Sequence, residues 1–252
     1  MASPSPSTRF DAIDALRGLA MVWMTVYHFV FDLNHFGYVR QDFYADPVWT
    51  TQRSMILSLF LFCAGMGQSI ALRQGQSWGR FWRRWIQVAA GAVLVSAGSW
   101  LMYPRSFIYF GVLHGIAVML VVARLTAHWG NWLWLWGVVA LVARFTVPEV
   151  LAQANLSEPF NSVWLNWLGL ATRKPITEDY VPLLPWLALV WWGVAAGNLL
   201  QARQQSAVLT WRPAHGPGQA LVWLGRWSLS YYLLHQPVMI GALSLWGWLQ
   251  IK

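Results

Sequence analysis

The sequence predicts an all-α integral membrane protein, a polytopic helical bundle with about seven transmembrane helices. Of its 252 residues, 57% are hydrophobic and only 10% are charged. A soluble domain carries about 25% charged residues, so this chain has too few to cover a soluble surface. The apolar segments are long enough to cross a bilayer, which takes about 20 residues in a helix.

The predicted spans follow one another with short polar connections. They are residues 13–36, 50–72, 82–103, 107–126, 130–147, 181–201 and 219–247. The last span is long and contains the segment HQP, so we expect a kink at Pro237. Residues 148–180 include VWLNWLGL, which is too short to span and is predicted to lie at the interface or to re-enter the membrane. Many of the 20 tryptophans lie near the ends of spans, as expected for interfacial anchors.

The termini and the charge distribution predict the topology. Residues 1–8 are rich in Pro and Ser and are predicted to be a disordered tail, while residues 9–252 are predicted to form a single transmembrane domain. The tail lacks the features of a cleaved signal peptide. The net charge of +8 is spread over short loops, which indicates orientation and attraction to anionic lipids rather than nucleic-acid binding. The arginine bias favours a cytoplasmic N-terminus.

The first span carries a stripe of polar residues. At 100° per residue, five titratable side chains fall within a sector of about 60° on a helical wheel. They are Asp14, Arg17, His28, Asp32 and His35. Because charged groups are costly in hydrocarbon, the stripe is predicted to face a protein interior or a water-filled cavity.

Depth along the helix separates the roles of these residues. Arg17 and His28 lie about 16 Å apart along the axis, so they cannot bond to each other, and Arg17 is placed near the cytoplasmic headgroups. Asp32 follows His28 by four positions, and such a pair can share a hydrogen bond. The carboxylate would fix the tautomer of the imidazole and raise its basicity, as a general base or nucleophile requires.

Two further histidines lie within apolar runs. His114 is in YFGVLHGIA, and His235 is in SLSYYLLHQPV, on the same helix face as Tyr231. Each histidine could line a substrate cavity or could instead make a packing hydrogen bond between helices. The histidines are dispersed, and neither Cys nor Glu accompanies them at ligand spacing, so no metal site is expected.

Four segments carry a resemblance to a known family. They are IDALRGLAMVWMTVYHFVFDLNHFG, FGVLHGIAVML, PLLPWLALVWWGVAAG and LGRWSLSYYLLHQPV. In this order they resemble bacterial relatives of the heparan-alpha-glucosaminide N-acetyltransferase catalytic domain family, which belongs to the transmembrane acyltransferase superfamily. The spacing of Arg17 and His28 is also similar to that in the related integral-membrane acyltransferase-three family, where the histidine is considered essential.

The resemblance implies a transmembrane acyltransferase that uses acetyl-CoA, or another acyl-CoA, as its donor. The acyl group would pass from cytoplasmic acyl-CoA to a hydroxyl or amine of a sugar or glycan on the far side of a bacterial inner (plasma) membrane. His28 and Asp32 are then the candidate catalytic residues. Asp14, Arg17, His35, His114, Tyr231 and His235 are the candidate substrate-binding residues, and Arg17, Arg80, Arg83 and Arg84 are candidates for the CoA phosphates.

The sequence is also compatible with other functions. Intramembrane His and Asp chains also form proton relays, so the alternative is a proton-coupled transporter of a small polar solute. Internal repeats would favour that alternative, and none is evident. A structural membrane subunit would leave the stripe without a role. The acceptor, the acyl chain, the kinetic order and homo-oligomer formation are not determined by the sequence.

Overall fold

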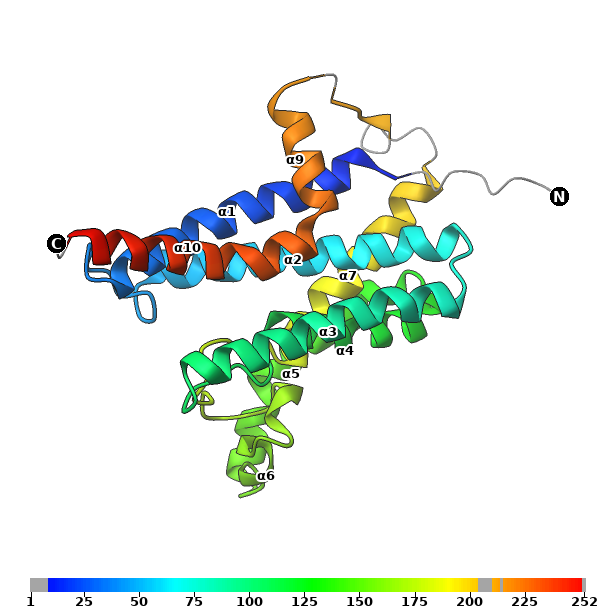
Figure 1. The fold of residues 1–252 in the computed structure, drawn as a ribbon. Coiled ribbons are helices and arrows are strands. Elements are labelled where there is room, and N and C mark those ends of the chain that lie inside the picture. Colours follow the sequence, from blue (N-terminus) through cyan, green and yellow to red (C-terminus); the bar gives the residue numbers. More distant parts are fainter. Residues whose placement is uncertain (1–8, 204–209, 214, 251–252) are drawn as a thin grey trace. The chain divides into compact units, whose positions relative to one another are not determined.

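The computed structural model describes residues 9–203, 210–213 and 215–250, which contain helices and no strand (Figure 1). The helices are α1 (Asp11–His35), α2 (Pro47–Arg73), α3 (Trp78–Met102), α4 (Val112–Thr126), η1 (Ala127–Trp129), α5 (Trp132–Gln153), α6 (Glu158–Asn161), η2 (Asn166–Leu168), α7 (Leu183–Ala202), α9 (Pro217–Arg226) and α10 (Ser228–Gln250). The predicted tail, residues 1–8, lies outside the described residues.

The chain forms two compact units. The terminal unit comprises residues 9–60 and the C-terminal residues from 207 onward, and the central unit consists mainly of residues 61–206. The division falls inside α2, after Phe60. The single domain predicted for residues 9–252 stays a prediction.

The all-α membrane fold predicted from the sequence is confirmed. Five of the described helical segments are long and apolar enough to cross a bilayer. They are α2, α3, α4 together with η1, α5 and α7. The predicted count of about seven is not confirmed, because α1 and α10 fall outside this set. The charged side chains of α1 reduce its mean hydropathy, and α10 carries Ser, Tyr, His and Gln side chains among its apolar ones.

Two predicted boundaries differ from the structure. The interruption of the last span lies at Trp227, between α9 and α10, and α10 continues through Pro237. Residues 107–110, predicted as helical, precede α4. Phe110 pairs instead with the extended segment at Tyr180, and the N–H of Val181 donates to the Phe110 carbonyl at 3.0 Å. This backbone pairing keeps residues 107–110 outside the helix.

In the terminal unit, α1 packs against α9 and α10 (Figure 1). The crossing with α9 is very close, since a Cβ atom at Gly225 would lie 1.8 Å from the Asp14 carbonyl oxygen. A Cβ atom at Gly18 would lie 2.0 Å from the Leu221 carbonyl oxygen. Glycine at both positions therefore lets the two backbones approach, as small residues do between membrane helices. An aromatic and aliphatic core that includes Met24 lies farther along α1.

In the central unit, α3 packs on α4, and both α4 and α5 pack on α7. Asn166, only 1% exposed, anchors the irregular segment before α7. Its side-chain NH₂ donates to the Tyr109 hydroxyl at 2.7 Å, and its backbone carbonyl accepts from the Tyr180 hydroxyl at 2.6 Å. Burial raises the pKa of Tyr180 to about 12, so this hydroxyl stays protonated and remains a donor at neutral pH.

Candidate active site

A buried polar cluster lies between α1 and α10 within the terminal unit. It consists of His28 and Asp32 from α1 and of His235 and Gln236 from α10. The imidazole rings of His28 and His235 are 5.2 Å apart between centroids. The Gln236 amide donates to Asp32 Oδ1 at 2.7 Å. Asp32 is 2% exposed and His235 is 8% exposed, so the cluster lies inside the protein.

The cluster has unused hydrogen-bonding capacity. Within the described part of the chain, four of its buried polar atoms have no hydrogen-bond partner: His28 Nδ1, Asp32 Oδ2, His235 Nε2 and Gln236 Oε1. Buried polar atoms are nearly always hydrogen-bonded, and leaving one unpaired costs about 1–3 kcal/mol. Four such atoms in one place therefore indicate a site that receives polar groups from a bound molecule or from water.

The predicted hydrogen bond between His28 and Asp32 is not formed in this structure. Asp32 uses one oxygen to bind Gln236. Neither its other oxygen nor His28 Nδ1 has a hydrogen-bond partner among the residues that the structure describes. Gln236 is not among the residues predicted from the sequence. The signal was present, because Gln236 is next to His235 in the segment HQP and is a polar residue within a predicted span.

The contacts of His235 fix its tautomer. His235 Nδ1 lies 2.8 Å from the backbone carbonyl oxygen of Tyr232. A carbonyl can only accept, so Nδ1 carries the hydrogen, and in the neutral ring Nε2 has a free lone pair. The Tyr231 ring stacks on the imidazole at 5.9 Å, with 9° between the planes. Thr25 donates to the Met21 carbonyl at 2.8 Å, so the Tyr231 hydroxyl is the donor in its 2.6 Å bond to Thr25.

Arg17 and Asp14 lie at the opposite end of the polar stripe, beside α9. Arg17 Nη1 is 3.0 Å from Asp14 Oδ1 and 3.5 Å from the Gly225 carbonyl oxygen. Arg226 from α9 binds Asp11 at 2.9 Å and lies 3.7 Å from Asp14. The guanidinium of Arg17 is therefore held in place near the N-terminal end of α1, and part of its surface is exposed.

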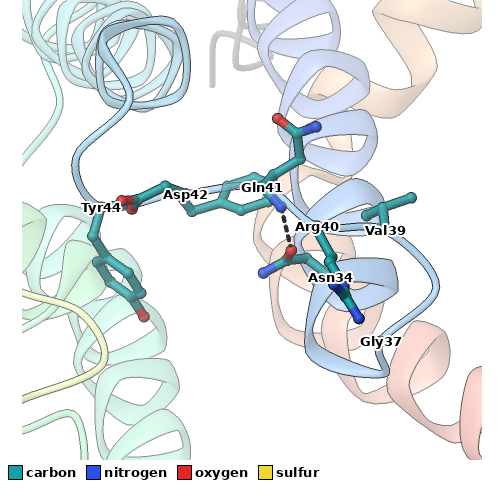
Figure 2. A pocket seen from close by; sticks show the side chains of 8 residues that line it. Asn34, Gly37, Val39, Arg40, Gln41, Asp42 and Tyr44 are labelled. Carbon is teal, nitrogen blue, oxygen red and sulfur yellow. Dashed lines mark hydrogen bonds between the residues drawn. The ribbon is translucent and has the colours of Figure 1, made fainter.

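His35 is exposed in the last turn of α1. The end of this helix and the loop after it line an open pocket of about 480 Å³ (Figure 2). The residues that line the pocket are Asn34, Gly37, Val39, Arg40, Gln41, Asp42, Phe43 and Tyr44. The backbone N–H of Gln41 donates to Asn34 Oδ1 at 2.7 Å and folds the loop back on the helix end. Figure 2 shows amide, guanidinium, carboxylate and phenol side chains around the same short loop. This lining offers both donors and acceptors to a polar ligand.

The remaining candidate residues belong to the central unit. His114 lies in the first turn of α4, where its Nδ1 accepts from the Gly111 N–H at 3.3 Å and its Nε2 is 3.1 Å from Ser96 Oγ. Both of its ring nitrogens thus have protein partners, as expected for the packing alternative. Besides Arg17, three candidate CoA-binding arginines are exposed at the start of α3: Arg80, Arg83 and Arg84. No group of three or more His, Cys, Asp or Glu side chains able to hold a metal occurs among the described residues.

The apolar helices and the buried polar cluster together define an integral membrane protein with an internal polar site. Residues 9–237 match the family described as heparan-alpha-glucosaminide N-acetyltransferase, catalytic. The match covers most of the 252 residues, so the chain belongs to this family of membrane acetyltransferases. The resemblance noted in the sequence is thereby confirmed, and the transporter alternative is not favoured. No curated protein and no solved structure matches the chain.

Proposed function

We propose that the protein transfers an acetyl or short acyl group from cytoplasmic acyl-CoA to a hydroxyl or amine of a sugar or glycan across the membrane. The observation that carries this proposal is the buried cluster around His28, with its four unpaired polar atoms. Acyl transfer needs a group that moves the acceptor proton and groups that hold both substrates. A buried His–Asp–His–Gln cluster in a chain of this family supplies those side chains.

His28 is the proposed catalytic residue. Its imidazole either takes the proton of the attacking hydroxyl or amine, or carries the acyl group transiently. Asp32 lies one helical turn away and, in the ionised form, would stabilise the imidazolium that forms. Catalytic hydrogen bonds are often absent without substrate and form only in the complex, so the open His28–Asp32 geometry is compatible with this role.

The donor is proposed to bind through arginines. CoA carries several phosphate charges, and a guanidinium binds phosphate through two parallel hydrogen bonds. Arg17 lies about 16 Å along α1 from His28, a distance that a long, extended donor such as CoA can bridge. Arg80, Arg83 and Arg84 are exposed at the start of α3 in the central unit, and their role in binding the CoA phosphates stays a prediction from the sequence.

The acceptor is proposed to approach from the other end of α1. Asn34 in the loop pocket is six residues beyond His28, which is about 9 Å along the axis. Asn, Arg and Asp side chains bind hydroxyl groups, and the exposed Tyr44 ring offers an apolar face to a sugar ring. In this arrangement the N-terminus is cytoplasmic, and the membrane is a bacterial inner membrane.

Release of CoA thiol by the purified protein tests the proposal. Wild-type protein in detergent should release thiol from acetyl-CoA in the presence of one of a panel of amino sugars and glycans. His28→Ala should reduce the rate by about 10²–10⁴-fold, the typical contribution of general acid–base catalysis. Asp32→Asn should reduce it less. His128→Gln is the matched control, because His128 is exposed in η1 of the central unit. Full activity of His28→Ala would exclude the assignment.

A further inference from the structure

We infer that His235 is a second catalytic residue and that its Nε2 is the base that removes the proton from the acceptor. The inference rests on the proposed acyl transfer and adds a residue to that site. Its basis is the hydrogen-bonding geometry of the two histidines in the cluster, which differ in how the protein holds them.

The protein holds His235 in one tautomer. The Tyr232 carbonyl accepts from Nδ1–H at 2.8 Å, so the free lone pair lies on Nε2, which is buried and has no partner in the described part of the chain. A general base needs this arrangement: one ring nitrogen anchored and the other open toward the substrate. The parallel ring of Tyr231, itself tied to Thr25, holds the plane of the imidazole.

His28 lacks such an anchor. Its contacts in this structure are ring contacts with Tyr27, Phe31 and His235, and its Nδ1 has no hydrogen-bond partner within the described residues. In the part of the chain that the structure describes, no hydrogen bond at Nδ1 selects its tautomer. His28 can donate to a carbonyl oxygen or accept from a donor, whereas the lone pair on His235 Nε2 can only accept.

This difference restricts which substrate His235 can contact. A thioester carbonyl has no proton to give, so neutral His235 cannot hydrogen-bond it through Nε2. The hydroxyl or amine of the acceptor does have such a proton. Gln236 Oε1, which is buried in the same cluster and has no partner among the described residues, can accept from another O–H or N–H of the acceptor.

The step conserves atoms and charge. With His235 as the base, the role that stays proposed for His28 is to carry the acyl group. The His28 imidazole attacks the thioester carbon, the carbon–sulfur bond breaks, and the thiolate leaves. The acceptor oxygen or nitrogen then attacks the acyl carbon on His28 while its proton moves to His235 Nε2, and the carbon–nitrogen bond to His28 breaks. His235 Nε2 returns the proton to the thiolate, which gives CoA thiol, the acylated acceptor and a neutral imidazole. Among the described residues, the rings in contact with His235 are those of His28 on α1 and of Tyr231 and Tyr232 on α10. Asp32, which Gln236 binds, is the acidic group of the same cluster.

Chemical rescue of a His235 variant tests the role. In His235→Ala, we expect thiol release to fall by about 10²–10⁴-fold, as for loss of a general base. Added imidazole should restore part of the rate, and the restored rate should rise with pH as imidazole loses its proton. A merely structural histidine would not give this pH-dependent rescue. His128→Gln, with an exposed histidine replaced, should keep the wild-type rate and should not respond to imidazole.

A second measurement needs no variant. In wild-type protein labelled with ¹⁵N-histidine, the His235 resonances should show a protonated Nδ1 and an unprotonated Nε2 at neutral pH. A protonated Nε2, or a His235→Ala variant that turns over at the wild-type rate, would overturn the assignment of His235. Absence of acceptor-dependent thiol release from the wild type would instead contradict the proposed function itself.

Discussion

Replacing Gln236 by leucine should destabilise the protein, because it removes the hydrogen bond that Asp32 receives. Asp32 is 2% exposed and accepts from the Gln236 amide at 2.7 Å, while its second oxygen has no partner in the described structure. Leu is close in size to Gln, so the change leaves little cavity. Losing a hydrogen bond to a charged buried group costs about 1.5–3 kcal/mol, and we expect a loss of that size in the free energy of unfolding.

Reversible unfolding in mixed micelles, followed by tryptophan fluorescence, measures this loss. Gln87→Leu is the matched control, since Gln87 is exposed on α3, and it should change the stability by no more than about 0.5 kcal/mol. A double variant, Asp32→Leu with Gln236→Leu, removes both polar groups and should regain part of the loss. Equal stability of Gln236→Leu and wild type would refute the reasoning, as would additive losses in the double variant.

Three further predictions follow from other parts of the structure. Gly225→Val should disrupt the packing of α9 on α1, because the Cβ would lie 1.8 Å from the Asp14 carbonyl oxygen. The free energy of unfolding should fall by about 1–3 kcal/mol, and an unfolding curve identical to that of the wild type would contradict this prediction. Asn166→Ala should cost about 1–3 kcal/mol in the same assay, since it leaves the partly buried Tyr109 hydroxyl without its donor. Unchanged stability would count against that bond. If the loop pocket binds the acceptor and contributes only ground-state affinity, Tyr44→Ala should raise the KM for the acceptor and leave kcat within about twofold. An unchanged KM would show that the acceptor does not bind in this pocket.

Much of the fold could be predicted from hydrophobic segments alone. The helices α2, α3, α5 and α7 lie where long apolar runs indicated them, because each run satisfies its own backbone hydrogen bonds wherever it packs. The number of spans could not be predicted in the same way. The first helix forms as expected, yet its charged residues give it a composition that no longer identifies it as a span.

Boundaries that depend on contacts between distant segments were not predictable. The start of α4 depends on the pairing of Phe110 with Tyr180, which lies far along the chain. The break at Trp227 follows a helix whose Gly225 packs against the Asp14 carbonyl of α1, whereas Pro237, the local signal for a kink, lies inside α10. A sequence pattern reports the local preference for helix, and in both places contacts with a distant segment decide where the helix begins or ends.

The candidate site could be predicted in part. Helical periodicity in α1 placed His28 and Asp32 on one face, and both lie in the polar cluster. Periodicity within one helix cannot say which residue of another helix lies opposite. The pairing of Asp32 with Gln236 and the approach of His235 to His28 therefore required the structure.

The position of the donor's acyl group tests the central claim most directly. A structure of the wild-type protein with a non-reactive acetyl-CoA analogue should show the acyl carbon close to the His28 imidazole, at about 3–4 Å, with CoA phosphates near Arg17. Binding of the acyl group elsewhere, for example beside His114 in the central unit, would contradict the account.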